Sequence, residues 1–311
     1  MAKIIGPGSL IVDITGFAPH LPVAGETTKG TALRLGPGGK GSNQMTAAHR
    51  AGSEVRLIGR RGDDALGQIL KKHYAAEGMS EEYIVVNPNG ETAGALIEIN
   101  ESDAQNRIVV VFAENELVTG ENVRAAEKAF ADCDAVLTQL ETTVDAVITA
   151  KELAKKHGKP FILNPAPYIP VPAEIFNGVD FITPNETEAE QFTGIPVDSV
   201  DGCRAAAREF LKMGVKNIIL TLGIRGVYYT NGKAETLIPA VKVKAVETTG
   251  AGDAFNGGFA TAIAEGMSVE TALKFASCTA AISVTRFGSS PSMPYRHEIL
   301  ALLKKEFGIT L

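Results

Sequence analysis

Residues 248–258 read Thr-Thr-Gly-Ala-Gly-Asp-Ala-Phe-Asn-Gly-Gly and carry the strongest signal in the chain. Gly250 and Gly252 lead directly into a helix predicted over residues 251–266, so free backbone N–H groups face outward at its positive end. This geometry suits a transferring phosphoryl group. Asp253 lies in the first turn of this helix and could have either of two roles. As a helix cap it would stabilise the fold by ~0.5–2 kcal/mol. As a general base it would accelerate the reaction by roughly 10²–10⁴-fold. Capping leaves the flanking glycines unexplained, so we favour the general base.

A second glycine-rich stretch, residues 36–43, reads Gly-Pro-Gly-Gly-Lys-Gly-Ser-Asn. It contains G-x-G-x-x-G, which can open a dinucleotide site when it follows the first central strand. Here it follows residues 27–35, which are predicted to lie outside the main sheet. It is not a P-loop either, because Lys40 is followed by a glycine and not by Ser or Thr. The glycines permit close approach of backbone to a ligand, and Lys40 and Asn43 add a cation and an amide. Alone, the stretch fits either a tight turn or a ligand-binding lip.

Around these two stretches, short β-rich runs alternate with helical segments, which is typical of parallel α/β packing. The strands are continuously apolar, as expected when both faces of a sheet are covered. The predicted strands cover residues 4–14, interrupted by glycine, and residues 55–59, 135–140, 161–164 and 217–222. The predicted helices cover residues 41–51, 64–78, 144–157, 251–266 and 268–285, with a short one after Asn185.

Two segments do not fit this alternation of buried strands and helices. Residues 27–35 and 92–111 alternate in polarity, or carry β-branched residues around a polar turn at 100–106. They are predicted to form antiparallel strands outside the main sheet, as a small β flap over one edge. Exposed strand edges invite pairing with a second copy, so a dimer is expected.

Composition narrows the functional class. The chain has 311 residues, 45% apolar and 21% charged, which excludes disorder for its bulk. Its net charge of −6, without long basic runs, argues against nucleic acid and anionic membranes as partners. The apolar runs are far shorter than the ~18 residues of a membrane span, and no secretory signal is recognised. Three scattered cysteines indicate neither a disulfide framework nor a metal knuckle, so a cytoplasmic protein is expected.

Together, residues 38–43 and 249–253 resemble the two signatures of the ribokinase-like (PfkB) carbohydrate kinases, and the likeness is nearest the ribokinase branch of that family. It covers nearly the whole chain. The connecting segments that also match are Gly25-Glu26-Thr27, Gly62-Asp63-Asp64, Asn164-Pro165-Ala166-Pro167, Pro184-Asn185-Glu186-Thr187-Glu188 and Thr221-Leu222-Gly223-x-Arg225-Gly226. The resemblance implies an α/β fold with a three-layer α/β/α core, a mostly parallel central sheet and a small β-sheet lid. It implies one domain over residues 1–311, with lid strands inserted at about 15–35 and 91–112, and a homodimer through the lid.

The resemblance also implies an activity: ATP-dependent phosphorylation of the primary hydroxyl of a pentose, as in the conversion of ribose to ribose 5-phosphate. Asp253 would be the general base, and Gly250, Ala251 and Gly252 would hold charge developing on the γ-phosphate. The residues implied for the sugar are Asp13, Gly39, Lys40, Asn43, Glu141 and Asp253. Those implied for ATP are Asn185, Thr221, Gly223, Gly226 and Gly252.

Two cations are implied as well. Glu188 would help to place Mg²⁺ through water, although Asn185 and Glu188 also have the spacing of a helix capping box. A monovalent cation, K⁺, would lie beside the anion hole. The residues implied for it are Glu247, Thr249, Ser283, Arg286, Gly288 and Ser292.

The chain departs from the family pattern at two positions. Ile11 stands where ribokinases usually carry an Asn that contacts the sugar, and an isoleucine cannot bond a hydroxyl. A hydroxyl buried without a partner costs ~1–3 kcal/mol, so a weaker preference for ribose is expected, with 2-deoxyribose or another furanose as a candidate. Glu247 stands where the family has the shorter Asp in its cation site.

Alternatives remain open. Fructose, a sugar acid or a nucleoside could replace the pentose within the same chemistry. A catalytically silent sugar or nucleotide sensor would lack Asp253 or its glycines, and this chain keeps both. A dinucleotide-dependent oxidoreductase fails on the position of G-x-G-x-x-G and gives no account of the segment ending at Asp253.

Overall fold

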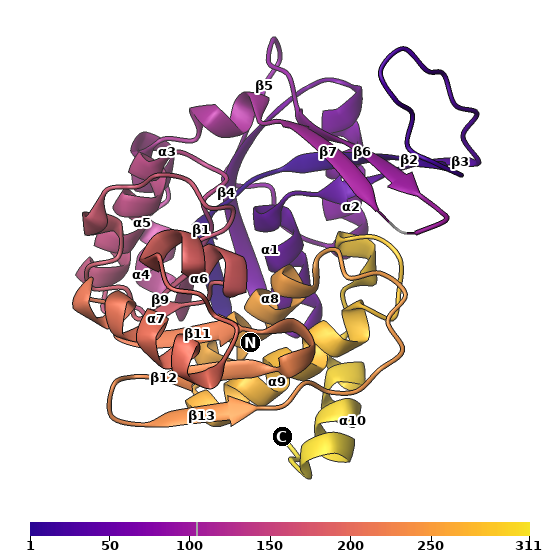
Figure 1. The fold of residues 1–311 in the computed structure, drawn as a ribbon. Coiled ribbons are helices and arrows are strands. Elements are labelled where there is room, and N and C mark those ends of the chain that lie inside the picture. Colours follow the sequence, from indigo (N-terminus) through magenta and orange to yellow (C-terminus); the bar gives the residue numbers. More distant parts are fainter. Residues whose placement is uncertain (104) are drawn as a thin grey trace.

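The computed structural model describes residues 1–103 and 105–311. Within them, nine strands form a central sheet in the order β13-β12-β11-β10-β9-β8-β1-β4-β5 (Figure 1). Neighbouring strands are parallel from β5 to β11, and β12 and β13 are antiparallel additions at one edge. The strands are β1 (Lys3–Pro7), β4 (Glu54–Gly62), β5 (Ile84–Asn87), β8 (Ala135–Thr138), β9 (Phe161–Leu163), β10 (Phe181–Ile182), β11 (Asn217–Thr221), β12 (Val227–Thr230) and β13 (Glu235–Ile238).

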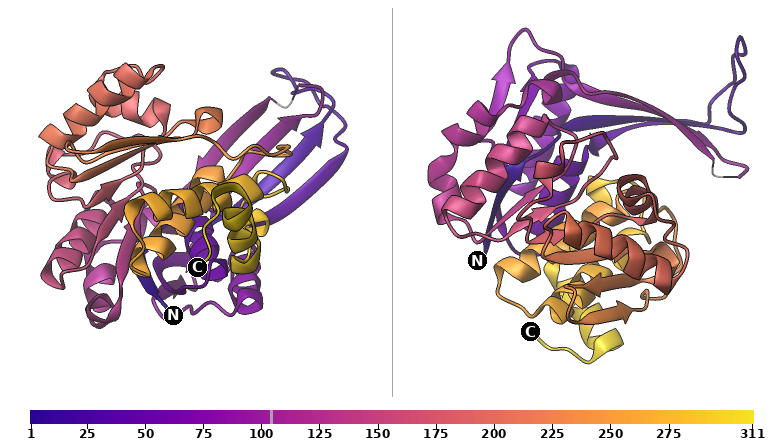
Figure 2. Two further views of the ribbon diagram at one scale, coloured as in Figure 1. Left: turned by 90° about the horizontal axis from the view of Figure 1, so that it is seen from below. Right: turned by 60° about the vertical axis from the view of Figure 1, so that its left-hand side comes forward.

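Helices cover both faces of this sheet, as Figures 1 and 2 show. They are α1 (Lys40–Arg50), α2 (Ala65–Glu77), α3 (Gly120–Ala125), α4 (Glu127–Asp132), α5 (Val144–Lys156), α6 (Glu186–Thr193), α7 (Val200–Lys212), α8 (Ala251–Ala264), α9 (Val269–Ser283) and α10 (Arg296–Phe307). Successive strand residues divide between two buried clusters. Ile5 packs with side chains of α3, α4, α5 and α7, whereas Ile4 packs with those of α1, α2, α8, α9 and α10. The core therefore has three layers, as expected for apolar strands buried on both sides.

A second sheet, which we call the flap, projects from the core (Figure 2). Its four strands, in the order β3-β2-β6-β7, are β3 (Ala32–Gly38), β2 (Ile11–Ala18), β6 (Ala93–Asn100) and β7 (Asn106–Val111). β2 pairs parallel to β6, and the other two pairs are antiparallel. The prediction of a mostly parallel α/β core with a separate small sheet is confirmed.

Two local predictions need correction. The single first strand predicted over residues 4–14 is wrong: the chain leaves the main sheet after Pro7 and enters the flap at Ile11. The strand predicted over residues 27–35 instead covers Ala32–Gly38 and runs almost directly into α1. The first error arises because Gly8 packs against Gly41, a contact between distant parts of the chain that local pattern cannot show. Among the described residues, no helix has the length and apolar character needed to span a membrane.

Candidate active site

The N-terminus of α8 opens onto a cleft of about 160 Å³. The lining residues are Lys40, Asn164, Ala166, Thr183, Asn185, Glu188, Thr221, Thr248, Gly250, Ala251, Gly252, Asp253 and Asn256. Asn164, Thr183 and Thr221 lie at or directly after the carboxyl ends of the parallel strands β9, β10 and β11, where open α/β sheets place their ligand sites. The two sequence signatures thus meet, because Lys40 opens α1 and residues 250–253 open α8.

The first turn of α8 carries unused backbone donors. Gly250 precedes it with φ 78°, a left-handed conformation that favours glycine. The N–H of Ala251 donates to the Thr248 carbonyl oxygen at 3.2 Å and is therefore engaged. Within the part of the chain that the structure describes, the N–H groups of Gly252 and Asp253 donate to no backbone oxygen. They are available as donors at the positive end of the helix dipole, and a methyl group at Gly252 would meet nothing within 4 Å.

Asp253 is buried, and both oxygens of its carboxylate accept from amides of α1. Asn43 Nδ2 donates to Oδ2 at 2.9 Å, and Gln44 Nε2 donates to Oδ1 at 3.0 Å. No side chain caps α8, so Asp253 is not a helix cap in this structure. Its carboxylate is held instead in a fixed orientation at the edge of the cleft.

A buried polar network supports this arrangement. Gln44 also donates to Asn164 Oδ1 at 2.9 Å and accepts from Gln139 Nε2 at 2.7 Å. Thr183 Oγ1 donates to Asn256 Oδ1 at 2.6 Å, and the Asn256 amide donates to the Gly252 carbonyl oxygen at 2.8 Å. Sequence reasoning missed Gln44, Gln139, Thr183 and Asn256 as supporting residues. A signal existed for two of them, since Gln44 and Asn256 directly extend the signatures.

Lys40 and Glu141 lie on the α1 side of the cleft. Glu141 Oε2 accepts from the Lys40 backbone N–H at 2.9 Å and from Ser9 Oγ at 2.5 Å. Burial raises the pKa of Glu141, although the Lys40 charge opposes it. Burial also lowers the pKa of Lys40, but the charges of Asp253, Glu141 and Glu188 outweigh it and the net pKa is raised. Lys40 therefore carries a positive charge in the cleft.

Asp13 reaches the site from the flap. Its Oδ2 accepts from Ser289 Oγ at 3.1 Å. Burial, opposed by that bond and reinforced by the charges of Asp253, Glu141 and Glu247, raises the pKa of Asp13 to about 6. A side chain at Gly38, on the paired strand, would come within 2.4 Å of Asp13 Oδ1, so glycine makes room for the carboxylate. Gly39, with φ 84°, then starts α1.

On the opposite side, Asn185, Glu188 and Thr221 line the cleft. The expected capping box is present: Asn185 Oδ1 accepts from the Glu188 N–H at 2.8 Å, and Glu188 Oε2 accepts from the Asn185 N–H at 2.9 Å. Burial raises the pKa of Glu188. Gly223 and Gly226 flank the short turn after Thr221 and do not belong to the lining of this cleft.

The residues predicted for a monovalent cation lie on two neighbouring segments. Glu247 Oε2 accepts from the Gly288 N–H at 2.9 Å, and Arg286 N–H donates to the Ser283 carbonyl oxygen at 3.1 Å. Ser292 Oγ donates to the Ser289 carbonyl oxygen. Arg286 forms an ion pair with Glu298. The set is rich in oxygen, which fits a hard cation, but the hydrogen bonds do not join Thr249 to the other members.

Comparison with known proteins gives one consistent family. Residues 1–296 match the model of the pfkB family carbohydrate kinases. The chain is 38% identical to a ribokinase of Haemophilus influenzae, covering 96% of this chain and 97% of that one. It is 36% identical to a deoxyribokinase of Salmonella typhi, covering 92% and 94%. A solved structure of Arabidopsis thaliana ribokinase complexed with ribose and ATP superposes with a TM-score of 0.87 at 30% identity, covering 98% and 99%.

Proposed function

Because this chain belongs to the pfkB family of carbohydrate kinases, we propose that it transfers the γ-phosphoryl group of ATP to the primary hydroxyl of a pentose. Ribose, converted to ribose 5-phosphate, is the first candidate, supported by the relatives that are ribokinases and by the structure complexed with ribose and ATP. The observation that carries the proposal is the position of Asp253 beside the open end of α8.

In the proposed reaction Asp253 accepts the proton of the sugar hydroxyl as its oxygen attacks the γ-phosphorus. A new oxygen–phosphorus bond forms, the bond to the bridging oxygen breaks, and ADP leaves with its electron pair. The N–H groups of Gly252 and Asp253 stabilise the charge on the transferred group. Asn43 and Gln44 aim the carboxylate, because each donates one amide hydrogen bond to a different one of its oxygens.

The other predicted site residues, in and around the cleft, divide between the two substrates. Asp13, Gly39, Lys40, Asn43 and Glu141 are proposed to bind the sugar, whose adjacent hydroxyls need both acceptors and donors. Asn185, Thr221, Gly223, Gly226 and Gly252 are proposed to hold ATP. Mg²⁺, when bound, neutralises charge on the phosphates; Glu188 fits it through water, since the cap uses Oε2 and leaves Oε1 as an acceptor.

A panel of pentoses, hexoses and nucleosides tests the proposal, with ADP release measured in the presence of ATP and Mg²⁺. We expect the highest kcat/KM with a pentose. ADP release with a hexose or a nucleoside alone would overturn the substrate class. Binding of sugar and ATP without any ADP release would instead support the sensor.

Ile11 supports a second candidate sugar, 2-deoxyribose. It is buried with Ala93 and Ala95, and it lies on the same face of β2 as Asp13, two residues away. At this position the side chain would offer a methyl group where the Asn usual in ribokinases would bond a hydroxyl. We therefore expect only a small preference in kcat/KM for ribose over 2-deoxyribose. Since one hydrogen bond to a hydroxyl contributes ~1–3 kcal/mol of discrimination, Ile11→Asn is expected to raise the ribose-to-deoxyribose ratio about tenfold.

Ile11→Val is the matched control, because it keeps the wall apolar and should leave the ratio unchanged. A strong preference of the unmodified protein for ribose would refute the deoxyribose assignment and favour the first candidate.

The Glu247 segment predicts activation by a monovalent cation. Its carboxylate and the neighbouring loop oxygens fit K⁺, which, when bound, adds positive charge beside the anion-binding end of α8. We expect turnover to be several-fold higher in K⁺ than in Na⁺ at equal ionic strength, and Glu247→Gln to remove most of that difference. Equal turnover of the unmodified protein in the two salts would show that no selective site exists.

The flap is also the proposed contact between two copies of the chain. It exposes apolar side chains on three strands, which a partner flap would cover. On one face of the flap these side chains are Leu33, Leu35, Leu96, Val109 and Val111.

A further inference from the structure

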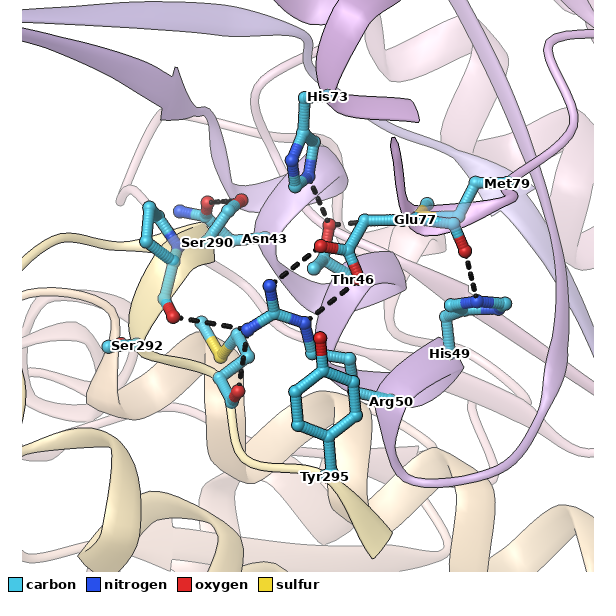
Figure 3. A network of polar contacts seen from close by, with 12 residues as sticks. Asn43, Thr46, His49, Arg50, His73, Glu77, Met79, Ser290, Ser292 and Tyr295 are labelled. Carbon is cyan, nitrogen blue, oxygen red and sulfur yellow. Dashed lines mark hydrogen bonds and ion pairs between the residues drawn. The ribbon is translucent and has the colours of Figure 1, made fainter. Parts of the chain in front are cut away.

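Arg50, the last residue of α1, forms a nearly buried ion pair with Glu77, the last residue of α2 (Figure 3). The side chains are 10% and 11% exposed. Two parallel bonds join them: Nη2 to Oε1 at 2.7 Å and Nε to Oε2 at 3.0 Å. Such a fork fixes the plane of the guanidinium, so its remaining donors also point in a fixed direction.

Those donors point at the loop between α9 and α10. Arg50 Nη1 donates to the carbonyl oxygens of Pro291 at 3.1 Å and Met293 at 2.7 Å. The ring of Tyr295 lies 4.9 Å from Cζ of Arg50 and covers one face of the guanidinium (Figure 3). One side chain therefore holds α1, α2 and residues 289–293 together.

Residues 289–293 reach the active site through two serines. Ser290 Oγ donates to Asn43 Oδ1 at 2.6 Å (Figure 3). This bond occupies the carbonyl end of the Asn43 amide and turns its NH₂ group toward Asp253, to which it donates at 2.9 Å. Ser289 Oγ donates to Asp13 on the flap. The position of this short segment thus sets the surroundings of both carboxylates.

We propose that Arg50 is a positioning residue for phosphoryl transfer. It holds residues 289–293 where Ser290 can orient the Asn43 amide against Asp253. The inference rests on the proposed function, because it takes Asp253 as the base. A lysine cannot replace it: an ammonium group has no planar fork, so it cannot serve Glu77 and two loop carbonyls in these directions at once.

The test is a double-mutant cycle on kcat with Arg50→Lys, Ser290→Ala and the double variant. We expect each single change to lower kcat about tenfold, with a smaller change in KM for ATP. If Arg50 acts through Ser290, the double variant loses little more than the worse single variant, since the two losses share one cause. Thermal unfolding is measured in parallel to keep stability separate from turnover.

Arg61→Lys is the matched control. Arg61 is 3% exposed, pairs with Glu81 at 2.9 Å and donates to the Gly62 carbonyl oxygen, but it has no hydrogen bond to residues 289–293. We expect it to lower stability and leave kcat near the unmodified value. The inference is overturned if Arg50→Lys lowers only stability, as the control does, or if the losses at Arg50 and Ser290 multiply. An unmodified protein that phosphorylates no sugar would reject the proposed function itself, and this inference with it.

Discussion

Asp253→Asn is expected to lower turnover by at least ~10²-fold while ATP binding changes little, because a neutral amide cannot take the hydroxyl proton. The substitution keeps the size of the side chain and the helix around it. The new amide oxygen can still accept from Asn43 or Gln44, but the new NH₂ group cannot accept from the other, so one of the two bonds is lost while the packing of α1 on α8 keeps its volume. Steady-state kcat for the best sugar, and the calorimetric Kd for ATP, are the two measurements.

Asp64→Asn serves as the comparison, because Asp64 does what the competing interpretation assigns to Asp253. It caps α2, accepting from the Gly67 N–H at 2.7 Å. We expect this change to reduce stability by ~1 kcal/mol or less and leave kcat alone. Near-normal turnover of Asp253→Asn would remove Asp253 from the role of base, and an equal loss in both variants would trace the effect to folding.

Much of the fold follows from patterns that are local in the sequence. Continuous apolar strands such as β8 and β9 require cover on both faces, and the structure has it. Other elements lacked so clear a pattern. The hairpin β12–β13 and the helices α7 and α10 were not predicted, although α7 has a fully buried Phe210 on its inner face. The exit of the chain from the main sheet after Pro7 depends on packing against α1, a contact across more than thirty residues.

In the candidate site, too, some features follow from local sequence pattern and others depend on contacts between distant segments. The glycines and Asp253 could be proposed from the sequence because the pattern that singles them out lies within one short segment. The partners of Asp253 could not be assigned, since Gln44 is 209 residues away and meets it only when α1 packs on α8. Arg50 gave no signal of a link to the site, because its acceptors in the loop before α10 are backbone oxygens 241 and 243 residues away, and backbone oxygens carry no sequence signature.

Gly252→Val is expected to lower kcat/KM for ATP by about 10²-fold, comparable to the loss of one preorganised donor to a developing anion. The structure gives the reason. A Cβ at Gly252 meets no protein atom within 4 Å, so the new side chain occupies the open space of the cleft, where we propose that the γ-phosphate lies. Gly252→Ala should lose less, because it adds one methyl group, and replacing a helical glycine by alanine should stabilise the fold by up to ~1 kcal/mol.

Gly257→Ala, further along α8, should have the opposite effect on stability to Gly252→Ala. A Cβ there would come within 2.4 Å of the Gln44 carbonyl oxygen and 2.5 Å of Ala47 Cβ, so α1 and α8 would be forced apart. We expect a lower thermal midpoint for that variant, whereas Gly252→Ala keeps or raises it and still loses activity. If a methyl group added at a glycine position lowers turnover without lowering stability, that position faces a substrate and not a neighbouring helix. Unchanged kinetics for Gly252→Val would mean that the phosphate never approaches the N-terminus of α8.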